Sequence, residues 1–169
     1  MRKLLVLFFF LLSFNLYAEI PFFIDFKYVL NESVAGKKAQ TALKNKLEKG
    51  LNQIREKEKK LREQEKNIIN QKKILTPEEY KKKVDKLRTD ANNLQKERKK
   101  ILDDVAKQRT NARNELLKNL NPIIKDYMKG KNIRMVIDKK NLIVADDDLN
   151  ITEDIVKKLN EKLKSINIK

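Results

Sequence analysis

From residue 35 to residue 120 the chain is rich in Lys, Glu, Leu, Ile and Gln, and one proline, Pro77, interrupts this helix-forming stretch. Inside a helix a proline costs roughly 3 kcal/mol, but as the first residue of a helix it costs little. Thr76 is a good N-cap, and Glu78 and Glu79 suit the positive end of a helix dipole. The pattern therefore predicts an antiparallel helical hairpin with its tip near residues 75–77, and favours it over one long kinked helix.

Apolar residues follow a heptad pattern on both sides of this break. Before it they recur every seven residues, at Leu47, Ile54, Leu61, Ile68 and Leu75. After it they follow steps of four and three, with two polar interruptions (Arg98 and Gln108), through Tyr80, Val84, Leu87, Ala91, Leu94, Arg98, Ile101, Val105, Gln108 and Ala112. Pairing the stripes predicts Ile68 beside Val84 or Leu87, Leu61 beside Ala91 or Leu94, and Ile54 beside Arg98 or Ile101.

The N-terminus has the pattern of a secretory signal peptide. Arg2 and Lys3 precede the apolar run "LLVLFFFLLSF", and a small residue, Ala18, follows. The run is shorter than the roughly 20 residues of a membrane span. We therefore expect residues 1–18 to be removed by cleavage between Ala18 and Glu19, although an uncleaved anchor stays open because residues 20–26 prolong the apolar character.

Composition excludes several kinds of chemistry. The chain has no Cys and no His, so it offers neither a thiol nucleophile, nor a His-based triad, nor a His/Cys metal site. It also lacks a glycine-rich phosphate loop. The acidic run at residues 146–148 reads as a solvated turn rather than a cation site. We expect no enzyme activity, no cofactor and no metal.

The two ends of the mature chain predict a small β-containing head. Residues 20–26 alternate as a strand, with Ile20, Phe22, Ile24 and Phe26 on one face. Residues 133–138 and 142–145 read as a β-hairpin, after Gly130 as the C-cap of the long helix. Thr152 begins a last amphipathic helix. The fold class is α+β, mostly α, with an arm (residues 35–120) inserted into a head (residues 19–34 and 121–169).

A head of 65 residues is marginal alone, and so few strands leave open edges. Joining the heads of several chains would cover these edges, so the sequence predicts an oligomer without fixing its number. The candidate oligomerisation residues are Phe22, Ile24, Phe26, Val136 and Ile143.

The order strand, helical hairpin, strand pair and helix resembles the Skp/OmpH family of periplasmic chaperones. The specific matches are "FFIDFKYVLNES" (22–33) and "NIRMVIDKKNLIVADDDLNITEDIVKKLN" (132–160). The resemblance implies a homotrimer in the periplasm, with a central β barrel formed by the heads. It also implies that three arms enclose a cavity for unfolded outer-membrane proteins, without ATP.

The arm is strongly basic. Residues 35–120 contain 26 Lys or Arg and 13 Asp or Glu, a net charge of +13. Such a surface suits acidic segments of an unfolded client, and an anionic lipid surface is a further partner that it allows. The candidate client-binding residues near the tip are Ile74, Leu75, Tyr80, Lys81, Lys82, Lys83 and Arg88.

Two alternative functions stay open at this point. A basic coiled coil also suits a histone-like nucleic-acid-binding protein, although export and the scarcity of Arg make nucleic acid the weaker partner. An uncleaved N-terminus would instead suit a membrane-tethered structural coiled coil.

Overall fold

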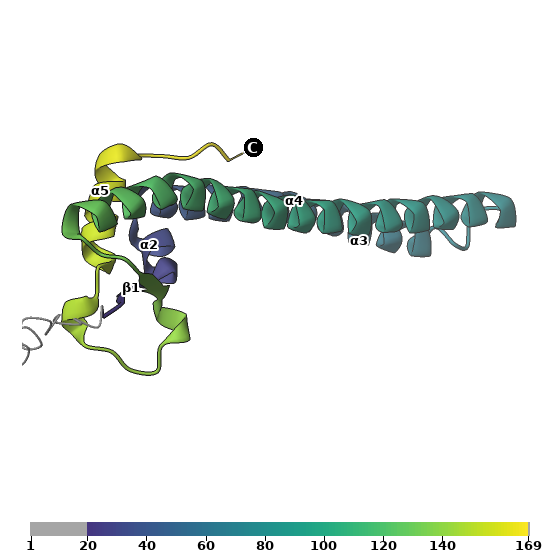
Figure 1. The fold of residues 1–169 in the computed structure, drawn as a ribbon. Helices are drawn as coiled ribbons and strands as arrows, with labels where there is room; N and C mark the ends of the chain where they lie inside the picture. Colours follow the sequence, from purple (N-terminus) through teal and green to yellow (C-terminus); the bar gives the residue numbers. More distant parts are fainter. Residues whose placement is uncertain (1–19, 169) are drawn as a thin grey trace, which may run out of the picture.

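The computed structural model describes residues 20–168 (Figure 1). Its elements follow in the order β1 (Phe22–Ile24), α2 (Phe26–Glu32), α3 (Val34–Asn70), α4 (Pro77–Lys131), β2 (Val136–Asp138), η1 (Lys139–Asn141), η2 (Asp147–Leu149) and α5 (Thr152–Lys162). Helices α3 and α4 run side by side as a long arm, and the short elements gather at one end as a head. The predicted mostly helical α+β architecture is confirmed. The predicted signal peptide and its cleavage site, Ala18 and Glu19, lie outside the described residues.

The tip of the arm has the predicted capping chemistry. Helix α3 ends at Asn70, residues 71–75 turn, and Pro77 is the first residue of α4. The Thr76 hydroxyl accepts a hydrogen bond from the Glu79 N–H at 3.3 Å, and the Glu79 carboxylate accepts one from the Thr76 N–H at 3.0 Å. This reciprocal capping box satisfies backbone donors that no preceding turn could satisfy.

The two arm helices pack through a narrow apolar seam. Ile54, Leu94 and Val105 are buried in it. Leu61 and Leu94 line one hollow, as the heptad pairing predicts. The helices approach closely at Gly50 in the middle part of α3, where a Cβ atom would lie only 2.8 Å from the Ile101 side chain.

Part of the predicted seam is wrong. Ala91 and Arg98 are exposed, whereas Asp90 and Glu97, one position earlier, are half-buried. The Glu97 carboxylate pairs with the Lys57 ammonium of α3 at 2.6 Å, so the Glu97 side chain reaches the other helix. A step of three where we expected four brings these residues inward. The other predicted interruption, Gln108, is half-buried, and its side-chain oxygen has no hydrogen-bond partner among the described residues.

The predicted β-hairpin is wrong as well. β1 pairs with β2 in parallel, with Phe22 opposite Val136 and Ile24 opposite Asp138. A parallel pair needs a long connection, which the whole arm supplies. After β2 the chain turns through η1, where the Asp138 carboxylate accepts a hydrogen bond from the Lys140 N–H at 3.2 Å. Residues 142–145 then form no strand.

The first strand is shorter than predicted, because Asp25 ends it. The Asp25 carboxylate accepts a hydrogen bond from the Tyr28 N–H at 2.8 Å and caps α2. The Asp25 N–H in turn donates to the Thr152 hydroxyl at 2.9 Å, which ties this turn to the start of α5. Phe26 therefore lies on a helix and not on the strand.

Gly130 is not the C-cap of the long helix. α4 continues to Lys131, and Asn132 takes the left-handed conformation with φ 55°. Asn tolerates this region because its short polar side chain bonds locally. The Ile133 N–H closes the helix end by donating to the Met128 carbonyl at 2.9 Å. The predicted start of the last helix at Thr152 is confirmed.

The head core joins both ends of the chain to the base of α4. Its largest fully buried hydrophobic members come from β1, α2, α4 and α5, and are Ile24, Val29, Leu120, Ile123, Ile155 and Leu159. The Tyr127 hydroxyl donates to the Asp154 carboxylate at 2.6 Å, which links α4 to α5. Burial and this carboxylate raise the pKa of Tyr127 to about 12.

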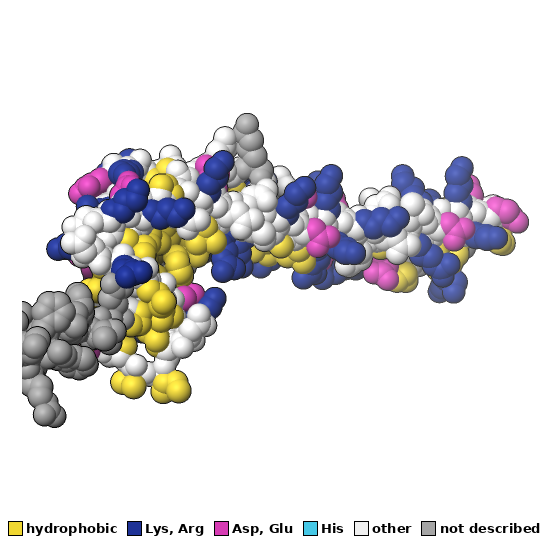
Figure 2. Space-filling model, in the orientation of Figure 1, with side chains coloured by type: hydrophobic (Ala, Val, Ile, Leu, Met, Phe, Trp, Pro, Cys, Tyr) yellow, Lys and Arg dark blue, Asp and Glu magenta, His cyan; other side chains and the backbone are white. Residues whose placement is uncertain are grey.

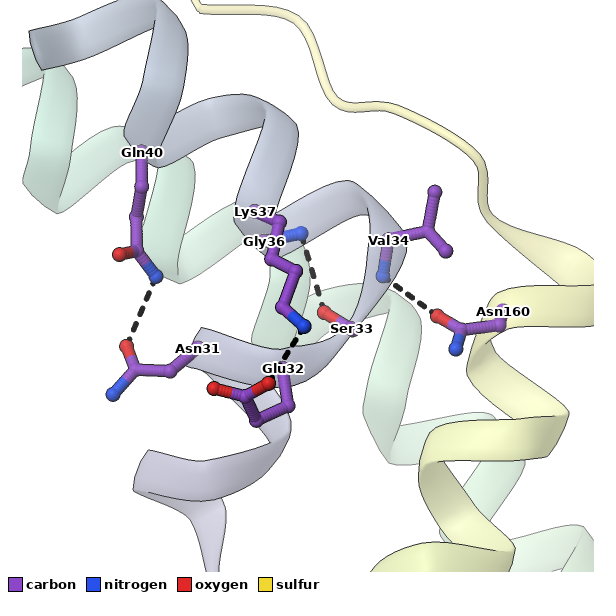
Figure 3. A network of polar contacts seen from close by, with 8 residues as sticks. All are labelled: Asn31, Glu32, Ser33, Val34, Gly36, Lys37, Gln40 and Asn160. Carbon is purple, nitrogen blue, oxygen red and sulfur yellow. Dashed lines mark hydrogen bonds and ion pairs between the residues drawn. The ribbon is translucent and has the colours of Figure 1, made fainter.

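A buried serine turns the chain from the head into the arm (Figure 3). Ser33 ends α2 and caps α3, where its hydroxyl accepts a hydrogen bond from the Gly36 N–H at 3.2 Å. The N–H of Val34, the first residue of α3, donates to the Asn160 side chain of α5 at 2.8 Å. An ion pair of 2.6 Å between Lys37 and Glu32 lies on the exposed side of this corner.

Two further findings apply to residues 20–168. None of the helices there is long and apolar enough to cross a membrane. No group of acidic side chains in this part of the chain could hold a metal ion. Within the acidic run at 146–148, Asp146 caps the turn η2, which begins at Asp147.

We predict that Gly36→Ala destabilises the head by about 3 kcal/mol, because a Cβ atom there would overlap the Leu30 carbonyl oxygen. Urea unfolding followed by circular dichroism would measure the loss. Gly130→Ala is the matched control, because nothing lies within 4 Å of its Cβ position. It should stabilise by about 0.5 kcal/mol through helix propensity. Equal effects of the two variants would contradict the close approach at the corner.

Candidate functional site

The distal arm carries the predicted client-binding residues. Ile74 in the tip turn is 82% exposed, whereas Leu75 and Tyr80 are half-buried. The Lys72 ammonium lies 5.8 Å from the centre of the Tyr80 ring, within range of a cation–π contact. The tip thus presents an aliphatic and an aromatic side chain beside lysines.

The predicted basic residues line the start of α4. Lys81, Lys82 and Lys83 are exposed, and the Lys83 ammonium donates to the Gln71 side chain at 2.7 Å across the turn. Arg88 lies farther along the helix, 3.7 Å from Asp85. The structure therefore brings Tyr80 and Lys83 to the tip turn, while Arg88 belongs to the shaft of the arm.

Acidic residues neutralise only part of the arm. Two ion pairs cross between the helices, Lys57 with Glu97 at 2.6 Å and Arg98 with Glu58 at 3.7 Å. Lys and Arg side chains nevertheless stand out along the whole arm, with acidic ones interspersed (Figure 2). The excess of basic residues makes the arm an attractive surface for polyanionic or acidic partners.

The predicted oligomerisation residues divide into two groups. Ile24 is fully buried, and Phe22, Phe26 and Val136 pack partly against the same core, so they stabilise the head itself. Ile143 is fully exposed. A charged substitution at Ile24 would therefore test folding rather than assembly, whereas Ile143 is available for contact with another chain.

The two-stranded sheet of the head has an open edge. β1 has β2 on one side and a bridge from Phe23 to Asn150 on the other. No described strand of this chain pairs with the outer edge of β2. Met135 and Val144 are also exposed, at 59% and 87%. Apolar side chains on an open edge are typical of a surface that a partner strand covers.

A groove of about 720 Å³ at the base of the arm, which we call the shoulder groove, was not predicted from the sequence. Its apolar lining residues are Leu30, Ala39, Leu43, Leu47, Ala112 and Leu116. Lys44, Arg109 and Arg113 also line it. Figure 2 shows hydrophobic side chains gathered where the head meets the arm, with basic side chains next to them. The only signal in the sequence was a pair of arginines, Arg109 and Arg113, in a chain whose basic residues are mostly Lys.

Comparison with known proteins identifies the family. The family model described as "Outer membrane protein (OmpH-like)" matches residues 22–159, which contain the head strands, the arm and most of α5. The chain belongs to the OmpH-like family. A search of curated proteins gave no match.

A solved structure shares the OmpH-like fold. It comes from Caulobacter crescentus and is assigned as an outer membrane chaperone (OmpH-like). It superposes with a TM-score of 0.81 at 17% sequence identity, over 88% of this chain and 89% of that chain. At this identity the likeness establishes the fold, including the long helical arm.

We predict that Thr76→Ala loosens the tip by about 1 kcal/mol, because the capping box loses the hydroxyl. Hydrogen exchange of residues 72–80 should speed up accordingly. The Thr76 N–H and hydroxyl also lower the pKa of Glu79, so this carboxylate favours the closed tip above the ordinary glutamate pKa. That contribution disappears as the pH falls through the lowered pKa. In Thr76→Ala the pKa of Glu79, followed by NMR, should rise.

Thr89→Ala is the control for this test, because Thr89 lies inside α4 and its hydroxyl bonds only to the Asp85 carbonyl at 3.0 Å. Exchange at the tip should be unchanged in that variant. Unchanged exchange in both variants would show that the turn is held by other contacts.

Proposed function

We propose that this OmpH-like protein is a holdase chaperone of the periplasm, which binds unfolded outer-membrane proteins and keeps them soluble without ATP. The observation that carries this proposal is the OmpH-like family match over residues 22–159, joined to a Caulobacter crescentus structure assigned as an outer membrane chaperone. Both descriptions name the outer membrane. Our proposal takes outer-membrane proteins as the clients, because such proteins cross the periplasm unfolded. The proposal includes no catalytic step.

The arm supports this function physically. A holdase must bind many sequences weakly and release them without fuel. Lys side chains suit this task, because their long stems offer apolar methylenes and their ammonium groups attract acidic segments without fixed geometry. Exposed Ile74 and half-buried Leu75 and Tyr80 add apolar contacts at the tip. Several weak contacts made at once give a useful overall affinity.

We further propose that three copies assemble through their heads. The open edge of β2 and exposed Ile143 and Val144 support an interface there. Assembly would place several basic arms around one space, and a client held by more than one arm would dissociate slowly. We propose the corresponding division of the chain, with a head (residues 19–34 and 121–169) for assembly and an arm (35–120) for client binding.

The two alternatives have less support. A histone-like role would use the basic arm, but the family description concerns the outer membrane. A tethered spacer would not need an excess of basic charge along the arm. An anionic lipid surface remains a further partner that the charge of the arm would attract.

Ile143→Asp should dissociate the assembled protein, because a charge buried without a partner costs several kcal/mol. The fold of one chain should survive, because Ile143 is fully exposed within it. Analytical ultracentrifugation would report the mass, and circular dichroism the helix content. Leu102→Asp is the control, since Leu102 is exposed on the arm, away from the head. A trimer that persists in Ile143→Asp, or a monomeric wild type, would contradict the proposed interface.

The protein in several-fold excess should suppress light scattering by an outer-membrane barrel protein diluted from urea. Suppression should weaken in 1 M salt, where the Debye length falls to about 3 Å, but should not vanish because the apolar contacts remain. Reversing four charges near the tip should slow capture about tenfold at low salt, since steering depends on long-range attraction. The four substitutions are Lys81→Glu, Lys82→Glu, Lys83→Glu and Arg88→Glu.

A matched variant would reverse four exposed lysines of the head and α4 base, namely Lys131, Lys139, Lys157 and Lys164. It changes the net charge equally and should affect capture much less. No suppression at low salt would overturn the holdase proposal. Binding of duplex DNA with a steep salt dependence, and none of the unfolded barrel, would favour the nucleic-acid alternative.

A further inference from the structure

The shoulder groove is a preformed hollow. It lies between α2, α3 and α4, where the arm leaves the head. Small residues form its deep part: Ala39 and Ala112 are 4% exposed, and Gly36 lies against the Leu30 carbonyl. Leu116 belongs to the head core. Because buried packing holds these walls, the groove does not need to form when a ligand arrives.

The basic residues of the groove are placed to receive a carboxylate. Arg109 and Arg113 are exposed and lie four residues apart, on one face of α4. Neither forms an ion pair or hydrogen bond with another residue in the described part of the chain. Lys44 lines the groove from α3, and only Glu48 pairs with it, at 3.9 Å.

Arginine suits a carboxylate better than lysine does. Only 8 of the 40 basic residues in the chain are Arg. A guanidinium group can grip a carboxylate with two parallel hydrogen bonds, which a lysine ammonium cannot do. Two arginines together beside an apolar groove therefore differ from the general lysine excess of the arm.

We infer that the shoulder groove binds a short client segment in which an apolar side chain stands within one or two residues of a carboxylate. The apolar side chain enters the groove between α3 and α4, and Arg109 and Arg113 hold the carboxylate at its edge. This inference rests on the proposed function, and it names the kind of client segment that the base of the arm recognises.

A peptide suits the groove better than the other occupants. Asn31, Gln40 and Thr41 also line it, and their amide and hydroxyl groups can bond to a peptide backbone but not to an alkyl chain. A second copy of the arm would place its own net charge of +13 against Arg109 and Arg113, so like charges would oppose that contact.

Two labelled peptides test the inference on the full mature chain by fluorescence anisotropy at low salt. One contains Leu and Phe followed by Asp, and the other has Asn in place of each Asp. We expect the Asp peptide to bind more tightly. Arg109→Gln with Arg113→Gln should weaken its binding fivefold to tenfold, in the range of about two exposed ion pairs, and should leave the Asn peptide nearly unchanged.

The matched control is Arg55→Gln with Arg62→Gln, which removes the same charge from exposed positions of α3 outside the groove. It should change the binding of the Asp peptide less than about twofold. Equal weakening by both double variants would mean general attraction to the arm, and would overturn the inference.

A second pair of variants tests the hollow itself. Thr41→Trp should fill the groove from an exposed lining position and weaken both peptides. Asn45→Trp, on the same helix but outside the groove, should weaken neither. Equal binding in the two Trp variants would overturn the inference.

Further outcomes separate this inference from the proposals before it. If wild type suppresses aggregation of the barrel protein but binds neither peptide, the inference is wrong and the holdase function stands. If wild type fails in both assays, both are wrong. Tighter binding of dodecanoate than of the Asp peptide would assign the groove to a lipid. Dissociation of the assembled protein in Arg109→Gln with Arg113→Gln would assign it to a contact between copies.

Discussion

The packing of the base of α4 against the two ends of the chain holds this molecule together. Leu120 and Ile123 on α4 are fully buried against side chains that arrive from β1, α2 and α5. The arm cannot take over this role, because its seam buries only a few residues, and half-buried Gln108 in it has a side-chain oxygen with no hydrogen-bond partner among the described residues. The head therefore anchors the arm, and the arm contributes little to the stability of the head.

This division explains why the arm can be so basic and still helical. Exposed ion pairs contribute little to stability, and the excess of basic residues repels itself. In a compact domain such repulsion would weaken the core. In two helices that extend away from the core, the charges spread over a long surface, where solvent and salt screen them. The same surface can then attract the acidic clients that we propose, at a small cost to the fold.

The corner at Ser33 links the two parts. Its hydroxyl and the Asn160 side chain satisfy N–H groups at the start of α3, and Gly36 lets the chain pass close to Leu30. The shoulder groove is a consequence of this corner, because α2 leaves α3 and α4 at an angle there and small residues leave space between the three helices. The binding surface that we propose thus lies where the head meets the arm.

The sequence by itself determined the local elements of this protein. Thr76, Pro77 and Glu79 set the tip, and heptad spacing set most of the arm, because capping and helical periodicity act between residues close in the chain. Only the tertiary structure decided the pairing of β1 with β2, the step of the seam at Glu97, the burial of Ile24 and the shoulder groove. Each of these features depends on residues far apart in the sequence. The alternating pattern of a strand does not reveal whether its partner strand is the next segment of the chain or one that follows the whole arm.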